Sequence, residues 1–207
     1  MDNLQEKQHD WEARYQEETV LPWDTGLTAP ELEEFFEAIP ETIRPKHVLE
    51  VGCGTGTNAV WMAKHGCTVV ATEIAPTALK AAEARASEEK VDIDFHLLDI
   101  CEKSPVPDAS QDLAFDRGVF HVIPAAMRPV FVQRLAAAVK PGGHWLCLAG
   151  SKDEVRENPE VGPPQLTAVQ LLEHVEPHFE VTSLTQTYFI LPDGTSHLGW
   201  KAIYKRR

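Results

Sequence analysis

Apolar residues recur along the chain in short blocks whose spacing alternates between that of a strand and that of a helix. Residues 47–74 hold the clearest example, in which an apolar strand over 47–51 leads into a glycine-rich turn, a helix follows to Lys64, and a second apolar strand ends at Glu73. The same reasoning predicts a helix over 76–89, strands over 93–98 and 111–116, a helix over 127–139 and a strand over 144–150. Because strands that alternate with helices form a parallel sheet, we expect an α/β fold that binds ligands at the carboxyl ends of its strands.

The last third of the chain breaks this alternation. The KPGG sequence at 140–143 is expected to end the preceding helix. The segment 151–165 is longer than most connections, which makes it a candidate binding loop. After it the sequence predicts a short helix and then an antiparallel hairpin around an Asp-Gly turn, over residues 167–174, 179–191 and 198–207.

Length and charge restrict the class of protein. The 207 residues suit one well-buried domain, and we expect a single domain with an N-terminal helical lid (1–45), a cofactor-binding core (46–150) and a C-terminal part (151–207) that holds the substrate loop, a helix and the hairpin. The formal net charge of −13 argues against nucleic acid as a partner, because binding to a polyanion depends on Lys and Arg.

The sequence also bears on cellular setting. No apolar run reaches the ~20 residues that span a bilayer, and the N-terminal segment is too polar for a secretory signal. We therefore expect a cytoplasmic protein without a membrane partner. The cysteines have no CxxC spacing, so we expect buried, reduced thiols without disulfide or metal roles at Cys53, Cys67, Cys101 and Cys147.

The glycine-rich turn after the first strand carries the candidate cofactor chemistry. Gly52, Gly54 and Gly56 let the main chain turn tightly and approach a ligand. Glu73 stands where a carboxylate can accept hydrogen bonds from both ribose hydroxyls of a nucleoside. In the dinucleotide-binding fingerprint Gly-x-Gly-x-x-Gly, the third glycine would stand one position after Gly56. That position is Thr57, so the pattern favours a different nucleoside cofactor.

The run LEVGCGTG, with an acid at Glu50 before the turn, resembles the first motif of class I S-adenosylmethionine-dependent methyltransferases. The resemblance implies S-adenosylmethionine as cofactor and a Rossmann-like seven-stranded sheet, mainly parallel with a C-terminal antiparallel hairpin and with helices on both faces. It also implies that Ile74 and Ile100 contact the cofactor and that Asp99 accepts a hydrogen bond from the adenine amino group. The alternative for Asp99 is a solvated turn residue.

The segments FDRGVFHVIP, WEARY, PWDTG and GPPQLT are together similar to the thiopurine and small-thiol S-methyltransferase branch, over nearly the whole chain. This resemblance places Arg117 beside the cofactor and the reacting substrate, and it uses Trp11, with Tyr15 one helical turn on, to cover the cofactor. The chain departs from the mammalian enzymes in its GCGTG loop and in its SHLGW segment, which offers Ser196 and His197 instead of a clear second arginine. The identity of the substrate therefore stays open.

Several of these residues have two interpretations. Trp11, Tyr15 and Trp23 form either a lid over the cofactor or a set of contacts that dock a helix on the core. Asp116 either lies near the methionine part of the cofactor or caps the next helical segment. Phe120 is either a wall of the substrate pocket or part of the core.

Thiol chemistry fits these residues better than alcohol chemistry. A thiol with a pKa near ~8.5 is already partly ionised at neutral pH, and an adjacent arginine such as Arg117 lowers that pKa further, whereas an alcohol needs a strong base or a metal. We therefore expect a monomeric enzyme that methylates the sulfur of a small thiol, with Arg117 and Asp116 in the catalytic set. The alternatives are O- or N-methylation with Asp116 or His121 as base, and a cofactor-binding module without catalytic activity. The alternative to the general base for His121 is a structural role.

Overall fold

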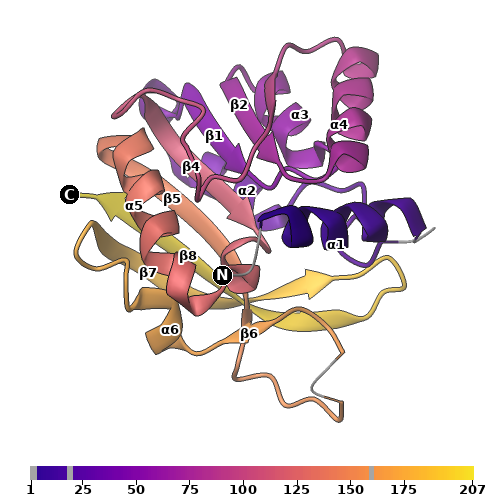
Figure 1. The fold of residues 1–207 in the computed structure, drawn as a ribbon. Coiled ribbons are helices and arrows are strands. Elements are labelled where there is room, and N and C mark those ends of the chain that lie inside the picture. The colour runs from indigo at the N-terminus through magenta and orange to yellow at the C-terminus, as the bar shows by residue number, and fades with distance from the viewer. Residues whose placement is uncertain (1–3, 18–20, 159–160) are drawn as a thin grey trace. The chain divides into compact units, whose positions relative to one another are not determined.

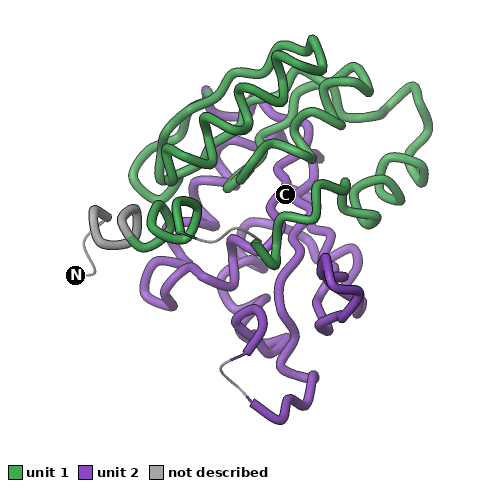
Figure 2. Tube along the Cα trace, turned by 90° about the vertical axis from the view of Figure 1, so that its right-hand side faces the viewer, with its two compact units in different colours: residues 1–106 green, residues 107–207 purple. Residues whose placement is uncertain are grey.

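The structure is a computed structural model, and it describes residues 4–17, 21–158 and 161–207. The chain folds into two compact units, residues 1–106 and 107–207, which are coloured separately in Figure 2. Each unit has its own strands and its own buried apolar side chains.

The first unit consists of three parallel strands and the helices that accompany them (Figure 1). Its elements are α1 (Leu4–Glu17), α2 (Pro30–Ala38), a 3₁₀ turn (Glu41–Ile43), β1 (His47–Val51), α3 (Thr57–Lys64), β2 (Thr68–Glu73), α4 (Pro76–Glu89) and β3 (Asp94–Leu97). The strand order is β3-β2-β1, with Leu49 opposite Val70 and Val70 opposite Asp94. Since the strands run parallel, their carboxyl ends lie on one edge, which includes the glycine-rich turn.

Local sequence accounts for the helix boundaries of this unit. α4 begins with Pro76, where the missing N–H has no intrahelical partner to lose, and Leu79 lies among alanines on its buried face. After α3, Gly66 takes a φ of 83°, and the N–H of Cys67 donates to the carbonyl of Met62. Both boundaries agree with the sequence predictions.

The second unit combines parallel and antiparallel strands. Its elements are β4 (Gln111–Arg117), two 3₁₀ turns (Phe120–Val122 and Ala125–Met127), α5 (Arg128–Ala138), β5 (Val139–Ser151), β6 (Gln165–Leu166), α6 (Ala168–Leu172), β7 (Phe179–Ile190) and β8 (Ser196–Arg206). The order is β4-β5-β8-β7, with β4 and β6 parallel to β5 and the β7–β8 hairpin antiparallel. The predicted fold class, mainly parallel with a C-terminal antiparallel hairpin, is confirmed.

Trp145 on β5 is the centre of the aromatic core of the second unit. Its side chain is completely buried, and its ring centroid lies 4.8 Å from that of Tyr204, 5.5 Å from Phe120 and 5.7 Å from Phe179. Aromatic pairs of this kind add about 0.5–1.5 kcal/mol each beyond their burial. The contacts join β5, β7 and β8 to the turn after β4, and so fix the main chain where β4 ends.

The largest difference from the predicted strand boundaries is at the start of β5. α5 ends at Ala138, close to the predicted helix end, but β5 begins at Val139 and includes the KPGG sequence at 140–143, whereas the strand was expected from residue 144. The register with β4 shifts between Gln111 and Leu113, and Gly142 takes a φ of 82° in this irregular stretch. A bulge thus lets the strand begin at Val139, before the glycine pair. β3 is one residue shorter at each end than the predicted strand.

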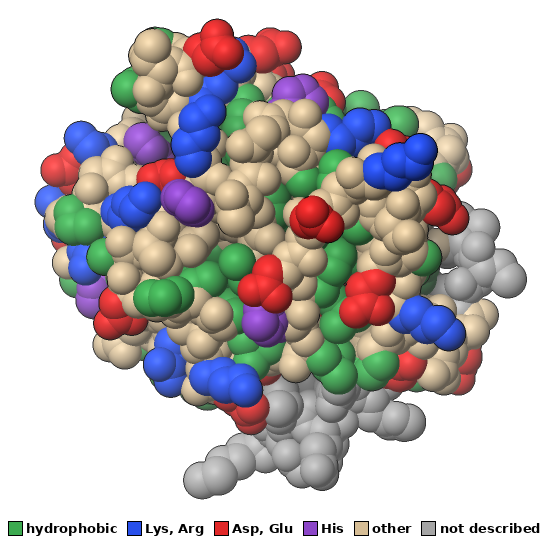
Figure 3. All heavy atoms as spheres, turned by 90° about the horizontal axis from the view of Figure 1, so that it is seen from above, with side chains coloured by type: hydrophobic (Ala, Val, Ile, Leu, Met, Phe, Trp, Pro, Cys, Tyr) green, Lys and Arg blue, Asp and Glu red, His purple; other side chains and the backbone are tan. Residues whose placement is uncertain are grey.

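The prediction of buried thiols is confirmed, since all four cysteines are free and buried. Figure 3 shows one face of the molecule, on which acidic and basic side chains are interspersed and no continuous basic field is seen. Within the described ranges, none of the helices has both the length and the apolar character needed to cross a membrane.

Candidate functional site

The glycine-rich turn between β1 and α3 brings neighbouring groups close to its main chain. Gly52, Gly54 and Gly56 have φ values of 65°, 55° and 82°, in the region that side chains disfavour. A Cβ on Gly54 would lie 3.0 Å from the hydroxyl oxygen of Tyr15, and one on Gly56 would lie 2.8 Å from the Cβ of Ala82. Gly54 therefore admits an aromatic side chain to the turn, whereas Gly56 lets α3 pack against α4.

Glu73 ends β2 with its carboxylate directed at the glycine-rich turn. One oxygen accepts a hydrogen bond from the N–H of Gly54 (2.9 Å), and the other accepts from the N–H groups of Ile74 (2.7 Å) and Ala75 (3.0 Å). Burial raises the pKa of Glu73, against these three hydrogen bonds, which lower it. The side chain therefore holds the strand end, the turn and the start of α4 in one arrangement.

Glu50, the acid before the turn, is only 2% exposed. The Asn58 side chain and the Ala59 N–H donate to its carboxylate, but the Oε2 atom has no hydrogen-bond partner among the described residues. Burial, with a further contribution from the Glu73 carboxylate, raises the pKa of Glu50 to about 8. A buried acceptor without a partner costs free energy, and a ligand that donates a hydrogen bond would relieve that cost.

Two charged residues from distant segments hold the middle of the turn. The hydroxyl of Thr55 donates to the carboxylate of Asp24 (2.8 Å), and Nε of Arg85 on α4 donates to the carbonyl of Thr55 (2.9 Å). Sequence reasoning missed both residues, because they lie 31 and 30 positions from Thr55 and belong to no motif. Their contacts help to hold the turn in this conformation.

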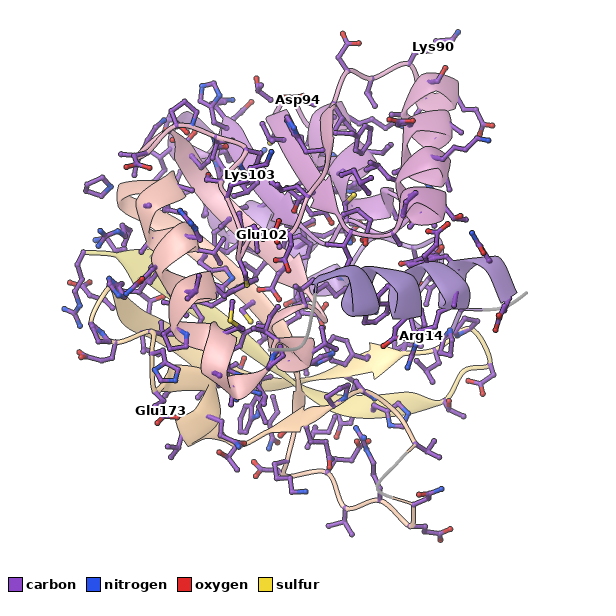
Figure 4. The ribbon with its side chains drawn as sticks, in the orientation of Figure 1. Arg14, Lys90, Asp94, Glu102, Lys103 and Glu173 are labelled. Atoms are coloured by element: carbon purple, nitrogen blue, oxygen red, sulfur yellow. The ribbon has the colours of Figure 1, made fainter. Side chains whose placement is uncertain are left out.

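Trp11 and Tyr15 of α1 form an aromatic cluster with Trp23. The ring centroids of Trp11 and Trp23 lie 5.5 Å apart, and Nε1 of Trp23 donates to the Tyr15 hydroxyl (3.2 Å). The Arg14 guanidinium, which projects from α1 in Figure 4, lies 5.3 Å from the centre of the Trp11 ring. Burial, and secondly the charge of Glu73, raise the pKa of Tyr15. The structure thus brings the three aromatic candidates together beside the glycine-rich turn.

Glu12 attaches α1 to the first turn of α4. Its carboxylate accepts hydrogen bonds from the N–H (2.9 Å) and hydroxyl (2.5 Å) of Thr77 and from the amide of Gln16 (2.6 Å). Desolvation raises the pKa of Glu12, but these hydrogen bonds together outweigh it and lower the pKa overall. The carboxylate also faces the positive end of the helix dipole of α4. A docked α1 is common to the lid interpretation and to the purely structural one.

Asp99 follows β3 in a tight turn. Its carboxylate accepts from the N–H of Cys101 (2.7 Å), and its carbonyl accepts from the N–H of Glu102 (3.0 Å), which is labelled in Figure 4. The N–H of the residue before Asp99 donates to the carbonyl of Glu73 (2.9 Å), so this turn adjoins the end of β2. Ile100 is 2% exposed. The geometry is compatible with both interpretations of Asp99, the adenine acceptor and the turn residue.

In the second unit, Asp116 lies near the end of β4 and is completely buried. Its Oδ1 accepts from the N–H of Phe120 (2.9 Å), and its Oδ2 accepts from Nε1 of Trp145 (2.8 Å). Burial raises the pKa of Asp116 to about 6, against these hydrogen bonds, which lower it. The carboxylate therefore caps the turn after β4 and joins it to the core.

His121 is buried in the same turn. Its Nδ1 accepts a hydrogen bond from the N–H of Gly150 (2.8 Å), which leaves the ring proton on Nε2. Burial lowers the pKa of His121 to about 3, with the charges of Arg117, Arg156 and Arg128 acting in the same direction. Such a ring cannot accept a proton near neutral pH, so the structural interpretation of His121 is favoured over the general base.

Arg117 and Phe120 have different surroundings. The Arg117 guanidinium lies 5.2 Å from the centre of the Phe189 ring on β7, within cation–π range. Phe120 is completely buried, with its ring centroid 5.6 Å from that of Phe131, which agrees with the core interpretation without testing the pocket interpretation. The end of β4 thus directs its arginine towards the C-terminal hairpin.

The loop between β5 and β6 is the predicted binding loop, and side chains anchor it. Nη1 of Arg156 donates to the carbonyls of Val161 (2.9 Å) and Pro163 (2.8 Å), and its Nε donates to the Glu154 carboxylate. Glu154 lies 3.1 Å from Nδ1 of His197. Sequence reasoning missed Arg156, because a loop without periodicity does not show which way its side chains point. The structure nevertheless links this arginine to the SHLGW segment, in which a second arginine was missing.

Comparisons with known proteins point to one family. The family model described as thiopurine S-methyltransferase matches residues 6–203. The 2-heptyl-1-hydroxyquinolin-4(1H)-one methyltransferase of Mycobacteroides abscessus is 28% identical over 166 residues, which cover 79% of this chain and 70% of that protein. The "Probable thiol methyltransferase 2" of Arabidopsis thaliana is 30% identical over 165 residues, which cover 80% of this chain and 70% of that protein.

A solved structure shares the fold. It comes from work on the conversion of a disulfide bond into a thioacetal group during echinomycin biosynthesis, and it superposes with a TM-score of 0.82 at 20% identity, covering 96% of this chain and 91% of that one. The cofactor of the family is S-adenosylmethionine. The chain therefore belongs to the thiopurine S-methyltransferase family and is an S-adenosylmethionine-dependent methyltransferase.

Proposed function

We propose that this enzyme transfers a methyl group to the sulfur of a small thiol. The observation that carries the proposal lies at the end of β4, which presents the Arg117 guanidinium while Asp116 and His121 are hydrogen-bonded inside the core. Neither of these two titratable groups is a ready base. A site that offers a cation but no general base suits a nucleophile that ionises near neutral pH, as a thiol does.

The first unit supports the binding of S-adenosylmethionine, whose ribose diol and ammonium group both donate hydrogen bonds. We assign the ribose hydroxyls to Glu73 and the ammonium group to the unpartnered Oε2 of Glu50. The positive φ values of the glycine-rich turn keep side chains away from the cofactor. The remaining cofactor contacts are assigned from the family resemblance to Gly52, Gly54, Gly56, Ile74, Asp99 and Ile100.

The docked α1 is assigned the role of a lid. Trp11 and Trp23 present apolar rings beside the glycine-rich turn, and the Tyr15 hydroxyl reaches the turn itself. Rings in this place would exclude water from a bound cofactor, which strengthens electrostatic interactions inside the site. From the family resemblance we also assign Tyr15 to the substrate.

When bound, S-adenosylmethionine supplies an electrophilic methyl group attached to a sulfonium. The side chains of this enzyme have to keep the acceptor ionised, hold it in line and exclude water. Arg117 meets the first need, because a guanidinium beside a thiol lowers the pKa of that thiol. Its place over Phe189 restricts its motion and so favours one orientation. Orientation alone can supply several of the roughly 8–23 kcal/mol by which enzymes lower barriers.

One observation supports a second acceptor class. The relative from Mycobacteroides abscessus is named for a hydroxyquinolinone, a hydroxyl compound. Methylation of oxygen would require a base, and the raised pKa of Asp116, about 6 through burial, would suit one. Both Asp116 oxygens, however, accept hydrogen bonds from the core. We therefore rank the thiol first and an acidic hydroxyl second.

We further propose that the enzyme acts as a single-domain monomer in the cytoplasm, on a diffusing small molecule and without nucleic acid or membrane as partner. The net charge of −13 supports the absence of a nucleic-acid partner, since it opposes binding to polyanions. Four free, buried thiols suit a reducing compartment.

A substrate panel tests the proposal. The enzyme would be incubated with S-adenosylmethionine and matched thiols, phenols and amines, and the release of S-adenosylhomocysteine would be measured. We expect turnover of thiols above that of the other two classes. Turnover of phenols or amines alone would replace the proposal with O- or N-methylation, and no turnover of any acceptor would favour a silent cofactor-binding module.

A further inference from the structure

The Arg156 side chain is 7% exposed, yet its guanidinium is only partly satisfied. Nε donates to Glu154, and Nη1 donates to the carbonyls of Val161 and Pro163. Nη2 is buried and has no hydrogen-bond partner among the described residues. Because a buried N–H without an acceptor costs free energy, an oxygen that reached Nη2 would gain a hydrogen bond protected from solvent.

Arg156 and Arg117 belong to one region of the second unit. The Arg117 guanidinium lies over Phe189, and Phe189 is the register partner of the histidine that lies 3.1 Å from Glu154. Glu154 in turn holds Arg156. Both guanidiniums are close enough to His121 for their charges to contribute to lowering its pKa, after burial. The end of β4, the hairpin and the loop thus converge.

The charges of this region favour an anion. Arg117, Arg156 and Arg128 contribute three positive charges, and Glu154 and Glu173, which lies near Arg128, contribute two negative charges, so these groups together carry one net positive charge. The nearby His121 is neutral, because burial lowers its pKa to about 3. In a chain with a net charge of −13, this local excess contrasts with the overall balance.

We propose that Nη2 of Arg156 binds a carboxylate of the acceptor, so that the preferred substrate is a small thiol acid whose sulfur is held at Arg117. This inference rests on the proposed S-methylation and narrows its substrate. Nη2 of Arg156 offers two N–H donors, and the charged groups of this region leave one net positive charge. Both features match a carboxylate monoanion. A phosphate dianion would bring more charge and more acceptor atoms than this region balances.

A matched pair of thiols tests the inference. The value of kcat/KM would be measured with 3-mercaptopropionate and with 3-mercaptopropionamide, which has nearly the same shape but no charge, and each would be referred to its own thiolate concentration. We expect the carboxylate to be preferred by at least about tenfold, the size of a hydrogen bond to a charged group. Equal values, or a preference for the amide, would overturn the inference.

Variants then locate the preference. Arg156→Gln should reduce the ratio of the two kcat/KM values to about one, and Arg156→Lys, which keeps a charge but not the fork, should keep part of it. Lys152→Gln is the matched control, since it removes a positive charge from an exposed position at the start of the same loop and should leave the ratio unchanged. A ratio that survives in Arg156→Gln, with both thiols slowed equally, would show that Arg156 only shapes the loop.

The outcomes separate this inference from the proposed function. If both thiols are methylated without preference for the carboxylate, the thiol assignment stands and the carboxylate site is wrong. If neither these nor other thiols are methylated while phenols or amines are, the proposed function is wrong. Should Arg156→Gln fail to fold, the wild-type ratio and the Arg156→Lys variant still decide.

Discussion

The two compact units hold their candidate site residues by different kinds of contact. In the first unit, main-chain N–H groups of Gly54, Ile74 and Ala75 converge on the Glu73 carboxylate. In the second unit, Arg117 and Arg156 are placed by an aromatic ring, a carboxylate and loop carbonyls from other segments. Main-chain geometry follows from a short local motif, whereas side-chain partners from distant segments depend on the whole fold.

This difference suits the two tasks. A cofactor with one fixed structure is served by the Glu73 carboxylate, which main-chain N–H groups hold in a position that changes little when other side chains change. An acceptor that differs between relatives is better served by side chains, because a few substitutions alter charge and shape without altering the fold. We therefore expect variants of the first unit to affect cofactor affinity and variants of the second to affect acceptor selectivity.

The largest effect is expected from Glu73→Ala, which tests the role of the first unit in cofactor affinity. The variant loses two proposed ribose hydrogen bonds to a charged acceptor, at about 1.5–3 kcal/mol each, so affinity for S-adenosylhomocysteine should fall on the order of a hundredfold or more. Isothermal titration calorimetry measures it. Glu102→Ala, an exposed acid in the same unit, is the control. Unchanged affinity in Glu73→Ala would mean that the acid serves only the strand end.

A pH-dependent effect is expected from Glu50→Gln. Burial raises the pKa of Glu50 from 4.5 to about 8 in the folded protein, so its contribution to stability is complete below about pH 4.5 and is lost as the pH rises through about 8. The glutamine side chain of the variant has no ionisable group at this position. Its free energy of unfolding should therefore exceed that of the wild type increasingly over this range, by on the order of a few kcal/mol.

The measurement for Glu50→Gln is urea denaturation of the ligand-free protein at several pH values. The difference in the free energy of unfolding should level off above about pH 8. A difference that stays constant from acid to alkaline pH would show that Glu50 keeps an ordinary pKa in the folded protein.

A smaller effect distinguishes two glycines of the first unit. Gly56 and Gly66 have nearly the same φ, 82° and 83°, but a Cβ on Gly56 would lie 2.8 Å from Ala82, whereas a Cβ on Gly66 meets nothing within 4 Å among the described residues. Backbone strain alone should make Gly66→Ala cost about 1–2 kcal/mol. Overpacking should add about 1–3 kcal/mol in Gly56→Ala. Equal costs in urea denaturation would contradict the close packing of α3 on α4.

The smallest effect is expected from Glu12→Ala, which removes the attachment of α1. Loss of a side chain that caps a helix typically costs about 0.5–2 kcal/mol. Because the attachment is local, α1 should become more accessible to protease and to hydrogen exchange while the global midpoint of unfolding changes little. Unchanged hydrogen exchange in α1 would show that the aromatic cluster of Trp11 and Trp23 suffices to hold it.

The sequence predicted the first unit better than the second. The helix over 76–89 and the end of β2 at Glu73 agree with the structure because alternation, a proline start and the glycine positions are local signals. The helix before KPGG ends at Ala138, close to the predicted position, but the strand expected from residue 144 already begins at Val139. A glycine pair also suits a bulge inside a strand, and only the register with β4 shows that this pair belongs to one.

Residues of the site were missed where their contacts are long-range. Arg156 lies in a loop without periodicity, and its link to His197 passes through Glu154, 43 positions earlier in the chain than that histidine. Asp24 and Arg85 support the glycine-rich turn through Thr55 in the same way. Asp116 was recognised as a strand-end acid, but only the structure shows both of its oxygens hydrogen-bonded in the core.

The pH dependence of one variant decides whether Arg117 stabilises a thiolate. Arg117→Ala should bind S-adenosylhomocysteine nearly as well as the wild type but show a lower kcat/KM with an aliphatic thiol, and Arg117→Lys should recover part of the rate. We expect a large defect at about pH 6.5 that shrinks towards about pH 9, where the thiol ionises without help. A defect of equal size at both pH values would contradict thiolate stabilisation and leave Arg117 only a role in positioning.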